Sequence, residues 1–173
     1  RGYCRSSIGR VSHLPVLRLA PVKENRNNCP FLTENHCAIH DAEPLVCALY
    51  PLAQEISREG KVSYFLQPTA CGGQMIEAKV QDYLARYDVP AREQVDVYWA
   101  QTCMKLEDTV EQLETMLDPV LVHRMQAKLW QALYFNYNDA EEFPPQLERN
   151  LRWLDDEFVK LAEYQRKLKN KSK

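Results

Sequence analysis

The pattern of apolar and polar positions separates a helical second part of the chain from an irregular first part. From Met75 onward, apolar residues recur three and four positions apart, which is the spacing of one face of an α-helix. The pattern predicts four helices: one that stops before Pro90, one over about residues 91–118, one that begins at Pro119 with Asp118 as its N-cap, and one that opens at Pro144. Their apolar stripes are, in order, Val80, Tyr83, Leu84 and Tyr87; Val95, Trp99, Cys103, Leu106, Val110, Leu113 and Leu117; Val122, Met125, Leu129 and Leu133; and Leu147, Leu151, Leu154, Phe158, Leu161 and Leu168. Because the connections are short and each stripe needs a partner, we expect antiparallel packing of the four helices.

Residues 1–74 lack this periodicity and contain most of the potential metal ligands. They hold five of the six cysteines, three of the four histidines and six of the ten prolines. Strand-like stretches are short and cover residues 16–19 and 62–66, the second after a turn at Glu59-Gly60. We therefore predict a mainly α protein, in which a small irregular cysteine-rich metal-binding part with short strands (1–74) is packed on a four-helix part (75–173) as one compact unit.

Composition and charge narrow the class of protein. With 173 residues, 45% hydrophobic and 27% charged, the chain is globular rather than collagen-like or acidic and disordered. Its 22 Lys and Arg are balanced by 24 Asp and Glu, so bulk attraction to nucleic acid is not expected. No apolar run reaches the roughly 18 to 20 residues of a membrane span, and residues 1–10 lack the apolar region of a signal peptide. We expect a cytoplasmic protein that binds neither nucleic acid nor a membrane.

Four cysteines in the first part, Cys29, Cys37, Cys47 and Cys71, are the candidate metal ligands. They lie in a proline-punctuated region beside short strands, where they can converge on one point. Converging thiols in a reducing compartment indicate a metal more often than a disulfide. The spacing does not identify the metal, because the paired knuckles of zinc fingers and the compact ferredoxin run are both missing. From the residues alone, zinc and an iron–sulfur cluster remain equal alternatives.

The residues around these cysteines resemble a known family. The segment carries, in order, Cys29-Pro-Phe-Leu, Cys37-Ala-Ile-His, Pro44-Leu-Val-Cys47-Ala-Leu-Tyr-Pro and Cys71-Gly-Gly. This series is similar to the second half of the YkgJ-type cysteine-cluster proteins, a zinc- or iron-chelating family that includes flagellin lysine-N-methylase. The resemblance covers residues 29–73, about a quarter of the chain. The sequence departs from the family at His40, Glu43 and Ala48, where the family has Tyr, Arg and Arg, and it lacks the upstream cysteine cluster.

The resemblance implies a metal domain, and for the methylase branch a 4Fe-4S cluster used with S-adenosylmethionine to methylate protein lysines. It therefore favours iron–sulfur over zinc. The sequence has no glycine-rich nucleotide loop, so methyl transfer rests on the resemblance alone. We expect an iron–sulfur protein that serves electron transfer or a protein modification and has a protein partner or protein substrate. The alternatives are a protein-lysine N-methyltransferase and an interaction module with structural zinc.

The remaining cysteines and histidines are weaker candidates. Cys103 lies on the inward stripe of a predicted helix, so we interpret it as a core thiol that is dispensable for metal binding. Cys4 could be a replacement ligand, part of a second site, or free. His36 and His40 flank Cys37, but four cysteines already complete a tetrahedral site, so we interpret both histidines as neighbours of the site rather than ligands.

Overall fold

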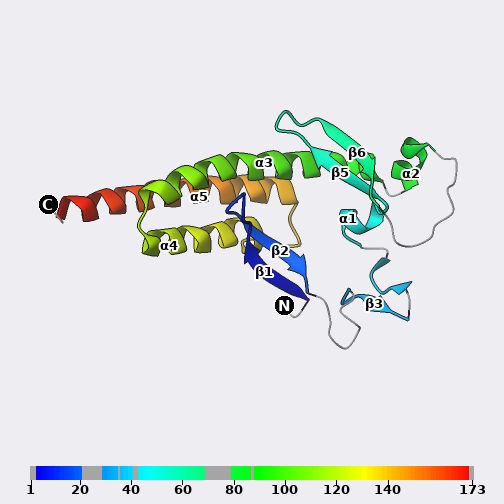
Figure 1. The fold of residues 1–173 in the computed structure, drawn as a ribbon, viewed down its shortest axis with the longest axis horizontal. Coiled ribbons are helices and arrows are strands. Elements are labelled where there is room, and N and C mark those ends of the chain that lie inside the picture. The colour runs from blue at the N-terminus through cyan, green and yellow to red at the C-terminus, as the bar shows by residue number, and fades with distance from the viewer. Residues whose placement is uncertain are drawn as a thin grey trace. The chain divides into compact units, whose positions relative to one another are not determined.

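The computed structural model describes residues 3–20, 29–34, 36–40, 43–68, 79–86 and 88–171 and is mainly α-helical (Figure 1). The chain forms two compact units. We call Arg1–Arg18 together with Cys103–Lys173 the helical unit, and Leu19–Thr102 the cysteine unit. No helix in the described part of the chain is long and apolar enough to cross a membrane.

The helical unit contains the second half of α3 (Val89–Met116), α4 (Pro119–Trp130), a short π-helix, η3 (Gln131–Phe135), and α5 (Phe143–Lys171). α5 contacts both α4 and η3. The predicted apolar stripes supply the core, and its buried members include Leu106, Val110, Leu113, Leu117, Met125, Leu129, Leu133, Leu147, Leu154, Phe158 and Leu161. The sequence pattern therefore located most of this core; in α4 the buried residue is Leu121, where Val122 was predicted.

The link between α3 and α4 confirms the predicted helix start. The Asp118 side chain accepts hydrogen bonds from the backbone N–H groups of Val120 and Leu121, at 2.9 and 3.0 Å, and Pro119 occupies the first turn. The backbone N–H of Asp118 in turn donates to Gln165 Oε1 of α5 at 2.9 Å. One residue thus caps α4 and connects it to α5.

An N-terminal hairpin belongs to the helical unit. Its strands β1 (Cys4–Ile8) and β2 (Pro15–Leu19) form a two-stranded sheet. Tyr134 Oη donates to the carbonyl of Pro15 at 3.0 Å, Gln126 Nε2 donates to the carbonyl of His13 at 2.8 Å, and His13 pairs with Glu114. These contacts are the physical reason why the hairpin belongs to the same compact unit as α4 and α5.

The cysteine unit is built from short elements. Strands β3 (Leu32–Thr33) and β4 (His36–Cys37) form one antiparallel pair, and β5 (Leu52–Ile56) and β6 (Val62–Leu66) form another. The helices are α1 (Leu45–Ala48), α2 (Val80–Arg86) and the first half of α3. The predicted strand over 62–66 is confirmed as β6, while β5 was not predicted.

α2 is the first of the four predicted helices, and its last stripe residue, Tyr87, lies outside the described residues. α2 belongs to the cysteine unit and not to the unit that contains α4 and α5. The mutual packing of four helices therefore stays a prediction, whereas the mainly α class is confirmed.

Candidate metal centre

Cys29 and Cys37 lie on one small hairpin. The backbone N–H of Leu32 donates to the carbonyl of Cys29 at 3.1 Å, which turns the chain directly after this cysteine. Leu32 is also the register partner of Cys37 across the β3–β4 pair. A second hydrogen bond, from Ala38 N–H to the carbonyl of Phe31 at 2.8 Å, continues the pairing. The turn and the strand register together bring two predicted ligands to the same end of this hairpin.

Cys47 lies on α1, which begins directly after Pro44. The Pro44 carbonyl accepts hydrogen bonds from the N–H groups of Cys47 and Ala48, at 2.8 and 3.2 Å. Proline suits this position because its own nitrogen has no hydrogen to donate. Cys47 is exposed, while the next residues, Ala48 and Leu49, are buried. The helix thus anchors itself through Ala48 and leaves the Cys47 thiol accessible.

The surroundings of Cys47 disfavour the ionised form of its thiol. Burial raises the pKa of the Cys47 thiol above its ordinary value, and the negative charges of Glu43, Cys29 and Cys37 raise it further. A bound cation would act in the opposite direction and favour the thiolates.

These three thiols do not form a complete ligand set. In the described part of the chain, no group of three or more His, Cys, Asp or Glu side chains could hold a metal ion. Cys71, the fourth predicted ligand, lies outside the described residues. Thiolate sulfur is the donor that thiophilic metals prefer, and Cys29 and Cys47 are exposed while Cys37 is half-buried.

The two histidines beside Cys37 have partners of their own. His36 Nδ1 lies 3.4 Å from the carbonyl oxygen of Glu34, and His40 Nδ1 lies 3.5 Å from Glu43 Oε2. Glu43 thus pairs with His40, and its charge also acts on the Cys47 thiol. In the sequence, Glu43 stands out only as a departure from the resembled family, and no ligand motif includes it. The one sequence feature that could have placed its charge near Cys47 is its position directly before Pro44, where α1 begins.

The other two cysteines lie in the helical unit. Cys4 is exposed on β1. Cys103 lies on α3 and is half-buried; burial, followed by the nearby charge of Glu107, raises the pKa of its thiol to about 11. A thiol with this pKa is protonated at neutral pH and is a poor nucleophile and ligand. This environment agrees with the interpretation of Cys103 as a structural thiol.

Comparison with known proteins adds no relative: no family model, no curated protein and no solved structure matches the chain. The resemblance of residues 29–73 to the YkgJ-type proteins therefore stays a hypothesis that rests on the cysteine motifs.

Proposed function

We propose that this protein binds a metal centre through Cys29, Cys37, Cys47 and Cys71, and that the centre is an iron–sulfur cluster. The observation that supports the proposal is that Cys29 and Cys37 lie on one hairpin and that their charges, after that of Glu43, act on the Cys47 thiol of α1. Thiolates are the ligands that both iron–sulfur clusters and zinc prefer. The cysteine motifs favour the cluster.

The sparse core around the cysteines supports a metal rather than free thiols. Among the described residues between 29 and 68, only Ala48 and Leu49 are buried apolar side chains. Two buried side chains contribute too little hydrophobic stabilisation to offset the entropy of ordering a segment of this length. A metal centre would supply the missing stabilisation, since metal binding and folding are coupled in such segments.

When bound, an iron–sulfur cluster would supply one-electron redox chemistry. The chain's own groups would tune it: Phe31, Leu32 and Ile39, which are half-buried, would supply apolar surroundings on the hairpin, and Glu43 would add negative charge. Electron transfer or support of a protein modification is the role that follows, with a protein as partner or substrate. Use of S-adenosylmethionine to methylate protein lysines stays a hypothesis that rests on the resemblance.

Metal analysis of protein purified without oxygen tests the proposal. We expect iron and inorganic sulfide in stoichiometric amounts and the broad visible absorption of a cluster. Single Cys29→Ser, Cys37→Ser and Cys47→Ser variants should each lose most of the metal, because one missing thiolate opens the coordination sphere. Cys103→Ala is the matched control and should keep the wild-type metal content.

Two results would contradict parts of the proposal. Stoichiometric zinc without iron would replace the cluster by a structural zinc site held by the same thiols. Wild-type metal content in all three serine variants would reject the site itself.

A further inference from the structure

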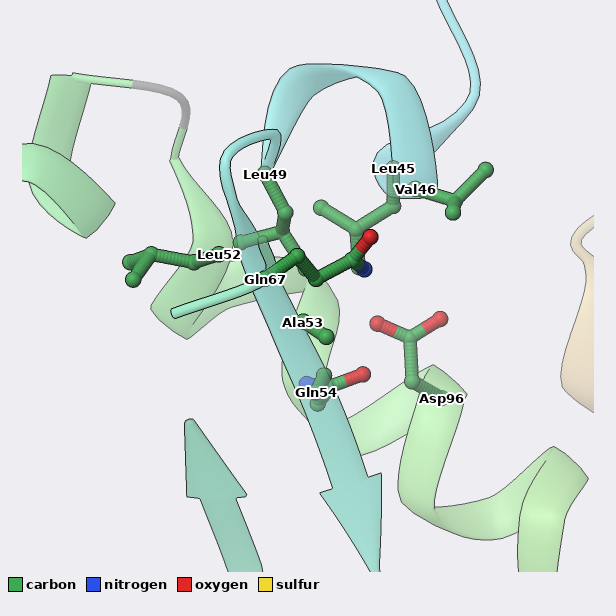
Figure 2. Close-up of a pocket in the computed structure, with 8 residues that line it drawn as sticks. All are labelled: Leu45, Val46, Leu49, Leu52, Ala53, Gln54, Gln67 and Asp96. Atoms are coloured by element: carbon green, nitrogen blue, oxygen red, sulfur yellow. The ribbon is translucent and has the colours of Figure 1, made fainter. Parts of the chain in front are cut away.

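A cavity of about 360 Å³ lies within the cysteine unit, bounded by α1, β5 and α3 (Figure 2). Its apolar wall includes Leu45, Leu49 and Leu52, and its polar groups are Gln54, Gln67 and Asp96. A volume of this size is at the small end of ligand pockets, and apolar walls with a few polar groups are typical of them. The cavity therefore has the dimensions and lining of a site for a small ligand.

Asp96 is the charged group of this cavity, and it has an unused acceptor. Figure 2 shows the carboxylate projecting from α3 toward the side chains of Leu45 and Gln67. Its Oδ2 atom is buried and has no hydrogen-bond partner among the described residues. Burial is the main reason that the pKa of Asp96 is raised, and Arg92 opposes this only in part. A buried carboxylate oxygen without a donor is unfavourable unless a ligand provides one.

A chain of two hydrogen bonds, from Gln54 to Tyr64 and from Tyr64 to Glu93, fixes the orientation of the Gln54 side chain. Tyr64 Oη lies 2.6 Å from Glu93 Oε2, and because an ionised carboxylate can only accept, Tyr64 must be the donor. Burial and this hydrogen bond raise the pKa of Tyr64 to about 12, so it keeps its proton at neutral pH. The Tyr64 oxygen can then accept from the Gln54 amide nitrogen, which lies 3.1 Å away. The Gln54 carbonyl oxygen is left as an acceptor for the cavity.

From these groups we infer that the cavity binds a small primary alkylammonium ion. An ammonium group has three donors and no acceptor, which complements the Asp96 carboxylate and the Gln54 carbonyl oxygen. Its alkyl chain would lie against the leucine wall and leave water. The negative charge of Asp96 disfavours an anion. A neutral alcohol of the same length offers one donor and leaves the carboxylate charge uncompensated. The inference uses groups on β5 and α3 and does not depend on the metal.

Ligand-binding measurements test this inference. They use the full chain with whatever metal it holds after purification. Isothermal titration with n-butylammonium, n-butanol and butyrate compares three ligands of similar length that differ in head group. We expect n-butylammonium to bind and the other two to bind at least about tenfold more weakly, as a charge-assisted hydrogen bond predicts. Nα-acetyl-lysine-N-methylamide carries the same ammonium group on a lysine side chain with peptide-like ends. Its binding shows whether the cavity accepts a lysine side chain of another protein or only a free alkylamine.

Variants then locate the site. Asp96→Asn keeps the size of the side chain but removes its charge, and it should weaken n-butylammonium binding about tenfold or more. Glu111→Gln is the matched control, because it removes an exposed charge from the same helix outside the cavity. Equal affinity of wild-type protein for amine and alcohol, absence of amine binding, or equal losses in the two variants would overturn the inference. The ligand comparison needs no variant, so it remains decisive if Asp96→Asn does not fold.

Discussion

Asp96 shows at the scale of one residue how a binding group can be unfavourable for folding. Its buried oxygen has no partner among the described residues, and its pKa is raised above the ordinary value of an aspartate. The folded protein therefore holds the Asp96 proton more tightly than the unfolded chain does. At neutral pH, where the carboxyl is ionised in both states, this difference lowers the free energy of unfolding.

Replacing Asp96 by Asn should make the protein more stable at pH 7. The gain should be smaller than the about 1–3 kcal/mol of a fully buried unpaired polar group, because Asp96 is only partly buried. It should shrink as the pH falls through the raised pKa of Asp96, since the wild-type carboxyl then becomes protonated and its penalty disappears. Urea unfolding of both proteins at several pH values measures this. A gain that stays constant down to acid pH would show that ionisation of Asp96 is not the cause.

Cys103 should react more slowly than Cys4 in the folded protein. Its thiol is half-buried and its pKa is about 11, so only a small fraction is thiolate at pH 8. Alkylation by iodoacetamide at pH 8 on metal-free protein, followed by peptide mass spectrometry, should label exposed Cys4 before Cys103. In denaturant the two rates should become similar. Equal rates in the folded state would mean that the environment of Cys103 does not protect it.

At the scale of elements, the corner between η3 and α5 depends on a buried glutamine. Gln146 is 2% exposed, and its Oε1 accepts from the backbone N–H of Asn138 at 2.7 Å. Its Nε2, which has two hydrogens to donate, lies 3.0 to 3.1 Å from the carbonyl oxygens of Asn138, Glu141 and Glu142. One side chain thus satisfies the backbone of the loop that leads into α5.

Gln146→Leu should therefore destabilise the protein although it places an apolar residue in a buried position. It leaves the Asn138 N–H and nearby carbonyls without this partner, which costs about 1–3 kcal/mol. Thermal or urea unfolding measures the change. Arg149→Ala is the control: it breaks only an exposed 3.1 Å pair with Glu141, worth about 0–1 kcal/mol. Similar small losses in both variants would show that the glutamine contacts are dispensable.

The same elements show which local structures the sequence could predict. The long helices α3 and α5 carry apolar residues at helical spacing over many turns, and the predicted ends of α3 and the predicted start of α5 lie within about two residues of those observed. Strand β1 is exposed at all five positions and β3 and β4 have two residues each, so none buries an alternating face that a pattern could reveal. The change from α4 to the π-helix η3 after Trp130 was not predicted. A π-helix has a wider turn, but the residues on either side of the change are similarly apolar, so the sequence pattern does not reveal it.

At the scale of the whole chain, the sequence could not predict the division into compact units. The contacts that join the N-terminal hairpin to the helical unit connect residues more than a hundred positions apart, such as His13 with Gln126 and Pro15 with Tyr134. Local periodicity contains no information about such pairs. The placement of Cys29 and Cys37 on one hairpin was more accessible, because the two cysteines are only eight residues apart in the sequence. The Asp96 cavity needed the fold, since its groups come from α1, β5 and α3.

Removing the metal should disorder the segment from about Cys29 to Cys71 while most of the helix remains. The helical unit has a continuous core, with Val110, Met125, Leu129 and Leu147 fully buried. By contrast, the only buried apolar side chains among the described residues between 29 and 68 are Ala48 and Leu49, so the proposed metal would contribute much of the order there. Chelated protein should keep most of its far-UV circular dichroism at helical wavelengths. Limited proteolysis with mass spectrometry should then find new cleavage sites between Cys29 and Cys71 and an intact fragment that contains α4 and α5.

The Cys47→Ser variant is the control for this experiment, because it should already lack the metal and show the same cleavage sites before the chelator is added. If the chelator produces new cleavage sites in this variant, it acts on something other than the proposed metal centre. If chelation of the wild-type protein instead abolishes the helical signal in one cooperative step, the metal stabilises a single folding unit that includes the helices. In that case the core of α3, α4 and α5 does not fold independently of the cysteine segment, and the two compact units are one in thermodynamic terms.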